Sequence, residues 1–106
     1  MAKYLISASY TSDGIKGLLQ DGGSARRDAA SRLLESVGGT VEAMYFAFGS
    51  SDAYVIVDMP DNVSVAAAAL AVGASGAVTT KTIVLLTPEE MDEACKKSPA
   101  YQAPGS

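Results

Sequence analysis

Three tyrosines and one aspartate are the side chains in this sequence that are best suited to hold a small molecule. Tyr10, Tyr45 and Tyr54 each carry a hydroxyl group on an apolar ring, and Asp52 ends a short loop, 49–52, between two apolar runs. A phenol donates and accepts hydrogen bonds, and a buried carboxylate whose pKa is raised towards neutrality can act as a general base. We therefore take these four as candidate ligand-binding residues, and we assign no catalytic residue.

Each of these side chains also has a structural explanation. Asp52 is more simply an acceptor of backbone hydrogen bonds within its loop. The tyrosine rings are more simply packing groups in an interface, and a ligand pocket is the less favoured interpretation. Arg26 and Arg27 could bind a carboxylate or a phosphate near a helix start, but a pair of solvated charges is the favoured interpretation.

The sequence contains no histidine, the side chain whose ordinary pKa best suits proton transfer near neutral pH. This absence excludes the Ser-His-Asp and Cys-His nucleophile systems, and also histidine-ligated zinc and histidine-bound haem. The one cysteine, Cys95, has only Lys96 and Lys97 beside it to lower the pKa of its thiol, so an inert thiol is favoured. We expect neither a metal site nor a cofactor.

The charge and hydropathy of the chain argue against two classes of partner. Its 106 residues carry a net charge of -4, and Lys and Arg never cluster in groups larger than a pair. A surface that binds nucleic acid needs such clusters. No stretch approaches the roughly 20 apolar residues of a membrane span, and residues 1–10 are too polar for a signal peptide. With a single cysteine, the chain is expected in the reducing cytoplasm.

The hydrophobic periodicity predicts one α+β domain. Strand-like and helix-like patterns follow one another as strand, helix, strand, strand, helix, strand, which is the order of the ferredoxin-like βαββαβ fold. Such a fold has a four-stranded antiparallel sheet with the helices on one face. Residues 1–97 are expected to form the domain and residues 98–106 a flexible tail. The predicted strands are 3–10, 40–48, 53–59 and 77–86, and the predicted helices are 14–20, 25–37, 62–72 and a short one after Thr87.

The loop 49–52 determines which residues of the second and third strands share a face. Closing a hairpin over four residues sets Phe48 opposite Ala53, and Glu42 and Asp58 then fall on opposite faces. The bulkier face, which we assign to the helices, holds Met44, Phe46, Phe48, Val55, Val57 and Met59. The other face holds Val41, Ala43, Tyr45, Ala47, Tyr54 and Ile56, with Ile6 and Tyr10 from the first strand.

This second face has no helix to cover it. An exposed apolar patch of several hundred Å² is more than a soluble monomer normally tolerates. Covering about 400 Å² per chain would contribute on the order of 10 kcal/mol before the cost of association. A second copy, packed sheet against sheet, covers the face most simply. The expected assembly is a barrel-like homodimer with space for a ligand between the sheets.

Several short motifs lie along residues 4–91. They are Thr11, Gly14 with Ile15, Arg26 or Arg27, Gly38 with Gly39, Tyr45 with Phe46, Gly49, Asp52, and Gly76 before Val78, Thr80 and Thr82. In these motifs the chain resembles the GYD domain proteins, a family of the dimeric alpha-beta barrel group. The family is named after a glycine, any residue, tyrosine, aspartate string. Gly49 and Asp52 keep the ends of that string, and Ser51 stands in the tyrosine position.

The resemblance implies a dimeric alpha-beta barrel with no established reaction. The wider barrel group includes isomerases, haem-degrading oxygenases and small-molecule binding modules, so the fold narrows function little. We expect a homo-oligomeric small-molecule binding or interaction protein, with any ligand held between the paired sheets. The alternative is a histidine-free enzyme, of the isomerase or cofactor-independent oxygenase kind, that uses Asp52 or a tyrosine in that intersheet cavity.

Overall fold

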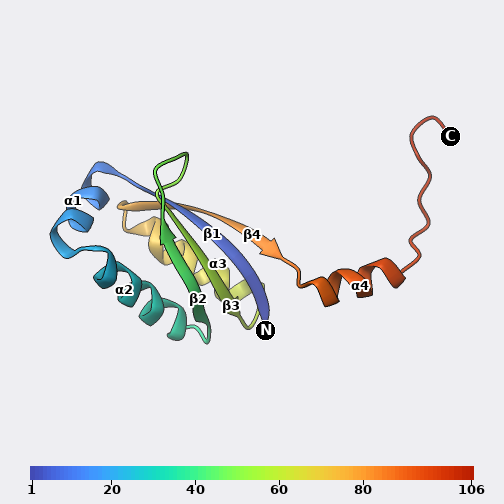
Figure 1. Ribbon diagram of the computed structural model, residues 1–106, viewed down its shortest axis with the longest axis horizontal. Coiled ribbons are helices and arrows are strands. Elements are labelled where there is room, and N and C mark those ends of the chain that lie inside the picture. The colour runs from blue at the N-terminus through green and yellow to red at the C-terminus, as the bar shows by residue number, and fades with distance from the viewer.

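The computed structural model describes residues 1–106 and shows one antiparallel sheet with helices packed on one side (Figure 1). The strands lie in the order β2-β3-β1-β4, and every neighbouring pair is antiparallel. The predicted α+β, ferredoxin-like βαββαβ arrangement is confirmed. The strands are β1 (Ala2–Tyr10), β2 (Thr40–Phe46), β3 (Ala53–Met59) and β4 (Val78–Leu85), and the helices are α1 (Ser12–Asp21), α2 (Gly23–Glu35), α3 (Asn62–Ala74) and α4 (Pro88–Lys96).

Side-chain caps determine where α1, α3 and α4 begin. The Thr11 hydroxyl accepts a hydrogen bond from the backbone three residues further on, and the Asp61 carboxylate accepts one of 2.8 Å from the Ser64 N–H. Thr87 and Glu90 form a reciprocal capping box. These acceptors satisfy N–H groups that the first turn of a helix leaves unpaired, so the chain turns helical directly after each capping residue.

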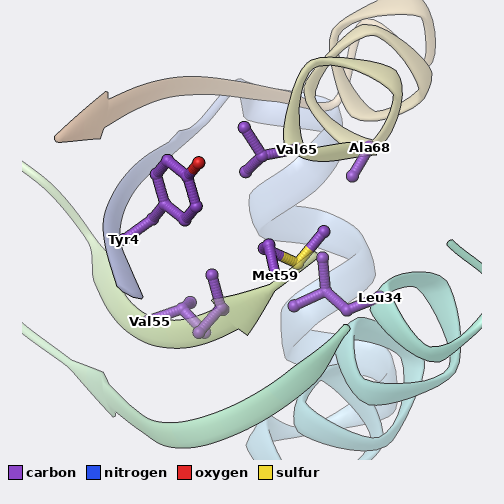
Figure 2. Packing of buried hydrophobic residues seen from close by; sticks show 7 residues of the cluster. Tyr4, Leu34, Val55, Met59, Val65 and Ala68 are labelled. Atoms are coloured by element: carbon purple, nitrogen blue, oxygen red, sulfur yellow. The ribbon is translucent and has the colours of Figure 1, made fainter. Parts of the chain in front are cut away.

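The core forms where the sheet meets α2 and α3. Small side chains on the helices leave room for larger ones from the strands, and Val57 and Met59 have no exposed surface. Figure 2 shows side chains of the strands and of both helices meeting in this layer. The main cluster consists of Tyr4, Leu34, Val55, Val57, Met59, Val65 and Ala68, and a smaller one consists of Ala8, Ala53 and Val78.

The hairpin between β2 and β3 differs from the predicted one in register, and it contains a bulge. Ala53 pairs with Phe46 instead of Phe48, so residues 47–52 connect the strands. This register shift of two residues leaves each side chain on its predicted face, because strand side chains alternate with a period of two. The register then slips by one residue between Val41 and Ala43, which reverses the faces of the residues before the bulge.

The observed structure corrects the predicted faces of four hydrophobic residues. Val41 lies on the helix side, where it packs against the main core cluster. Ile6 pairs with Val55 and also faces the helices, so β1 is one residue out of phase with the prediction. Tyr10 has the same orientation and packs against the smaller cluster. Phe48 lies in the loop and is fully exposed instead of facing the helices.

Beyond β4 the chain leaves the layered part of the fold. Helix α4 has no buried residue and projects from the end of β4, away from the sheet and the other helices (Figure 1). No helix or strand follows Lys96, and all of residues 97–106 are exposed. The chain's own C-terminal segment therefore does not cover the helix-free side of the sheet.

Candidate functional site

The helix-free side of the sheet carries two adjacent rows of paired residues that cross from β2 to β4. We call the surface formed by these rows the open face. Tyr45 is 70% exposed and Ile83 is 51% exposed, because nothing in the chain lies over them. One row is Ala43, Ile56, Leu5 and Ile83, and the other is Tyr45, Tyr54, Ser7 and Lys81.

A charged cluster lies at one end of the open face. Lys3 Nζ is 2.9 Å from Asp58 Oδ1 and 3.1 Å from Glu42 Oε1. The two carboxylates were predicted on opposite faces, but Glu42 lies at the bulge and so shares the side of Asp58. Hydrogen bonds to Asp58 and then to Glu42 raise the pKa of Lys3 above its ordinary value. Two acids around one lysine leave this end of the face with a net negative charge.

Asp52 fastens the β2–β3 loop to β1. Its Oδ2 accepts a 2.8 Å hydrogen bond from the Tyr10 N–H, and its own N–H donates one of 2.8 Å to the Ala8 carbonyl. Asp52 therefore accepts a backbone hydrogen bond, as predicted, but the donor belongs to β1 and not to its own loop. Asp52 also lines a hollow beside α1, together with Phe46 and Phe48, and none of the candidate tyrosines lines that hollow.

The four candidate ligand-binding residues do not form one site. Tyr45 and Tyr54 are cross-strand partners on the open face. Tyr10 lies on the other side of the sheet, beneath the helices, and Asp52 lies in the hairpin loop. Only the tyrosine pair therefore remains as a candidate on the face where all four were expected to meet.

A cavity lies between the sheet and helices α2 and α3, on the side away from the open face. Its volume is about 110 Å³, and 14 of its 16 lining residues are hydrophobic. A wider hollow of about 390 Å³ adjoins it on the side of α1. The residues that line both spaces are Tyr10, Arg26, Ala29, Leu33, Val72 and Val78.

Arg26 lines this cavity, a position that was not predicted from the sequence. Its Nε is buried without a hydrogen-bond partner, and no ion pair includes it. Arg27, by contrast, is 59% exposed and lies 3.7 Å from Asp28. The interpretation as a solvated charge therefore holds for Arg27 but not for Arg26. The residue spacing in the sequence could have indicated this position. Arg26 precedes Ala29 by three residues and Leu33 by seven, which puts it on the apolar side of α2.

Three further features of the chain concern metals, the thiol and membranes. No three His, Cys, Asp or Glu side chains gather where they could hold a metal ion. Cys95 is exposed on α4 and forms no disulfide. No helix combines the length and the hydrophobicity that crossing a membrane requires.

Comparison with known proteins identifies a family but no described activity. A family model described as GYD domain matches residues 4–95. None of the curated proteins matches the chain. Among solved structures, the chain is similar to a protein of unknown function from Nitrosomonas europaea, with 20% sequence identity, a TM-score of 0.41, and coverage of 94% of this chain and 96% of that one. Since the family model spans nearly the whole layered fold, the chain belongs to the GYD domain family.

Proposed function

We propose that the chain assembles into a homo-oligomer through the open face and acts as a small-molecule binding or interaction protein. One observation carries this proposal, namely the apolar row at the centre of the open face. Ile56, Leu5 and Ile83 are direct neighbours across three strands, and no helix or tail segment of the chain covers them. A continuous apolar row on a sheet surface favours burial against another apolar surface.

A second copy of the chain is the partner that suits this surface best. Two sheets pack face to face at a distance of about 10 Å, with the side chains of both inner faces interdigitating. In a twofold arrangement each copy would contribute the same rows, so the surface needs to complement only itself. The charged cluster around Lys3 would lie at the margin of the contact and Ile56 nearer its centre, which matches the polar rim and apolar core of protein interfaces.

The tyrosine pair supports a small-molecule site within the same contact. Tyr45 and Tyr54 are cross-strand partners, and their hydroxyls would offer hydrogen bonds beside the apolar row of the open face. A ligand that combines an apolar body with a few polar groups would fit such a surface. We place this activity in the cytoplasm, where the free thiol of Cys95 would stay reduced.

The enzymatic alternative has less support. Asp52, its proposed general base, accepts a hydrogen bond from the Tyr10 N–H and lines the hollow beside α1. It shares no pocket with the Tyr45 and Tyr54 pair. Binding is therefore a better proposal than proton transfer for the space between two open faces.

Light scattering on the purified chain tests the proposed assembly. At micromolar concentration the natural chain is expected to give the mass of a dimer or a larger multiple. Ile56→Glu puts a charge into the central row and is expected to give the monomer mass. Leu70→Glu is the matched control, because Leu70 is 74% exposed on α3, away from the open face. A monomeric natural chain, or dissociation by Leu70→Glu but not by Ile56→Glu, would contradict the proposal.

A further inference from the structure

The cavity beneath α2 and α3 supports a second binding site, on the other side of the sheet from the open face. We propose that it binds a small monocarboxylate with an apolar body. The carboxylate of this ligand binds to the guanidinium of Arg26, and its apolar body lies between the two helices and the sheet. This site goes beyond the proposed oligomer, because all of its lining residues come from one chain.

Arg26 offers an unused hydrogen-bond donor and an unpaired charge. Its Nε is buried without a partner, and it takes part in no ion pair. A buried donor without a partner destabilises the fold, because no hydrogen bond offsets the loss of its hydration. A guanidinium presents its N–H groups in a planar fork that matches the two oxygens of a carboxylate. A bound carboxylate would therefore satisfy the donor and neutralise the charge at the same time.

Arg26 lies near the start of α2, where α1 ends. The Arg26 N–H bonds to the Gly22 carbonyl at 3.4 Å, so Arg26 belongs to the first turn of the helix. Gly22 occupies the N-cap position and provides no side-chain cap. The first turn of an uncapped helix carries the positive end of its dipole, but Gly22 is also the C-cap of α1, whose negative end meets it there, so the guanidinium of Arg26 supplies the positive charge that attracts the anion.

The remaining lining is suited to a hydrocarbon. Alanines from α2 and α3, among them Ala30 and Ala69, leave the space empty because their side chains are short. A volume of about 110 Å³ is somewhat smaller than the engineered cavity of about 150 Å³ that binds benzene. The apolar body is therefore a branched chain of a few carbons or one small ring. Tyr10 and Thr80 add hydroxyl groups to the lining.

Two acidic residues restrict the ligand to a single negative charge. Asp13 and Asp21 line the wider hollow next to the cavity, but neither forms an ion pair with Arg26. Their charges disfavour a phosphate or a dicarboxylate, whose second charge would find no cation to pair with. A monocarboxylate is the anion that one guanidinium in an apolar cavity can accommodate.

A titration of the full-length, ¹⁵N-labelled chain, followed by NMR, tests the proposal. The probes are isovalerate and benzoate, and their uncharged counterparts are isovaleramide and benzamide. At least one acid is expected to shift the amide signals of cavity residues such as Ala30 and Val72 in a saturable way. The matching amide is expected to bind roughly 10- to 100-fold more weakly, because a hydrogen bond to a charged group is lost. Equal binding of acid and amide, or no response to either acid, would overturn the proposal.

Substitutions of cavity residues test whether the acid binds in the cavity. Arg26→Gln keeps most of the side-chain length and is expected to weaken binding of the responsive acid roughly 10- to 100-fold. Arg27→Gln is the matched control, because Arg27 is its exposed neighbour, and the affinity should not change. Ala69→Leu leaves Arg26 intact but fills the space for the apolar body, so it is expected to abolish binding while the circular dichroism spectrum stays that of the natural chain. Unchanged binding in either Arg26→Gln or Ala69→Leu would overturn the proposal.

One more variant separates this site from the open face. Ile56→Glu is designed to disrupt the oligomer, and the affinity for the acid is expected to stay within about twofold of the natural chain, since Ile56 lies on the other side of the sheet. Loss of acid binding in Ile56→Glu would place the ligand on the open face and overturn the proposal. Failure of the oligomer test with acid binding retained would leave the cavity site standing.

Discussion

The backbone N–H of Tyr10 donates a 2.8 Å hydrogen bond to Oδ2 of Asp52, and this bond joins the last residue of β1 to the loop between β2 and β3. Asp52 is also the last residue of the string that begins at Gly49, where Ser51 replaces the tyrosine of the family name. The loop is fastened through the aspartate and its own backbone, not through a ring at position 51. The motif aspartate therefore has a structural role in this chain that Ser51 does not disturb.

Replacing Asp52 should destabilise the fold rather than remove an activity. Asp52→Ala leaves the half-buried Tyr10 N–H without a partner, which we expect to lower the free energy of unfolding by about 1–3 kcal/mol. Asp52→Asn keeps an acceptor oxygen and should lose less. Ser50→Ala, at an exposed position in the same loop, should leave stability unchanged. Urea denaturation followed by circular dichroism measures all three, and an Asp52→Ala chain as stable as Ser50→Ala would contradict the structural role.

Two glycines of α1 should respond in opposite directions to the same substitution. A Cβ at Gly14 would collide with the carbonyl oxygen of Ala77, which is backbone and cannot swing away. Gly14→Ala is therefore expected to destabilise the chain by about 1–3 kcal/mol. A Cβ at Gly17 meets nothing within 4 Å, so Gly17→Ala should stabilise by roughly 0.5–1 kcal/mol through helix propensity. Thermal unfolding of both variants is the measurement, and a shift in the same direction for both would show that α1 does not approach Ala77 this closely.

The elements that local signals specify could be predicted from the sequence. Helices α1, α3 and α4 follow capping residues, Thr11, Asp61 and Thr87, whose acceptors bond to N–H groups within three residues. Helix α4 shows how local this information is, because the proline and acids that follow Thr87 predicted it although none of its residues is buried. A signal of this kind needs no knowledge of the tertiary fold.

Features that depend on distant partners could not be predicted. The bulge at Glu42 allows contact with Lys3, a residue 39 positions away, and the phase of β1 depends on its pairing with β3. Tyr45 and Tyr54 were nevertheless placed on the correct face, because a register error of two residues preserves the alternation of side chains. Arg26 was misjudged because the cavity it lines exists only once α2 and α3 lie over the sheet.

The ion pairs of Lys3 should contribute to stability in a salt-dependent way. Lys3→Gln leaves the carboxylates of Glu42 and Asp58 facing each other without a cation, so we expect a lower urea midpoint. The loss should shrink at about 1 M NaCl, where the screening length falls to about 3 Å. Lys81→Gln is the matched control, because Lys81 lies on the same face and forms no ion pair. All chains are compared at one protein concentration, and equal losses in both variants would contradict a specific role for the cluster.

The cap of α3 should make stability depend on acid pH. A hydrogen bond from the Ser64 N–H lowers the pKa of Asp61 below its ordinary value. The folded chain thus prefers the charged carboxylate, so this contribution is fully present above the unfolded pKa and is lost as the pH falls through the folded pKa.

Asp61→Asn can accept the same hydrogen bond but has no proton to gain, which makes it the reference chain. The urea midpoint of the natural chain relative to Asp61→Asn is expected to be higher at about pH 6 than at about pH 2, because the other titrating groups are common to both chains. Asp61→Ala should be the least stable at about pH 6, since it loses the cap itself. A midpoint difference between the natural chain and Asp61→Asn that stays constant over this range would mean that the Asp61 charge does not stabilise α3.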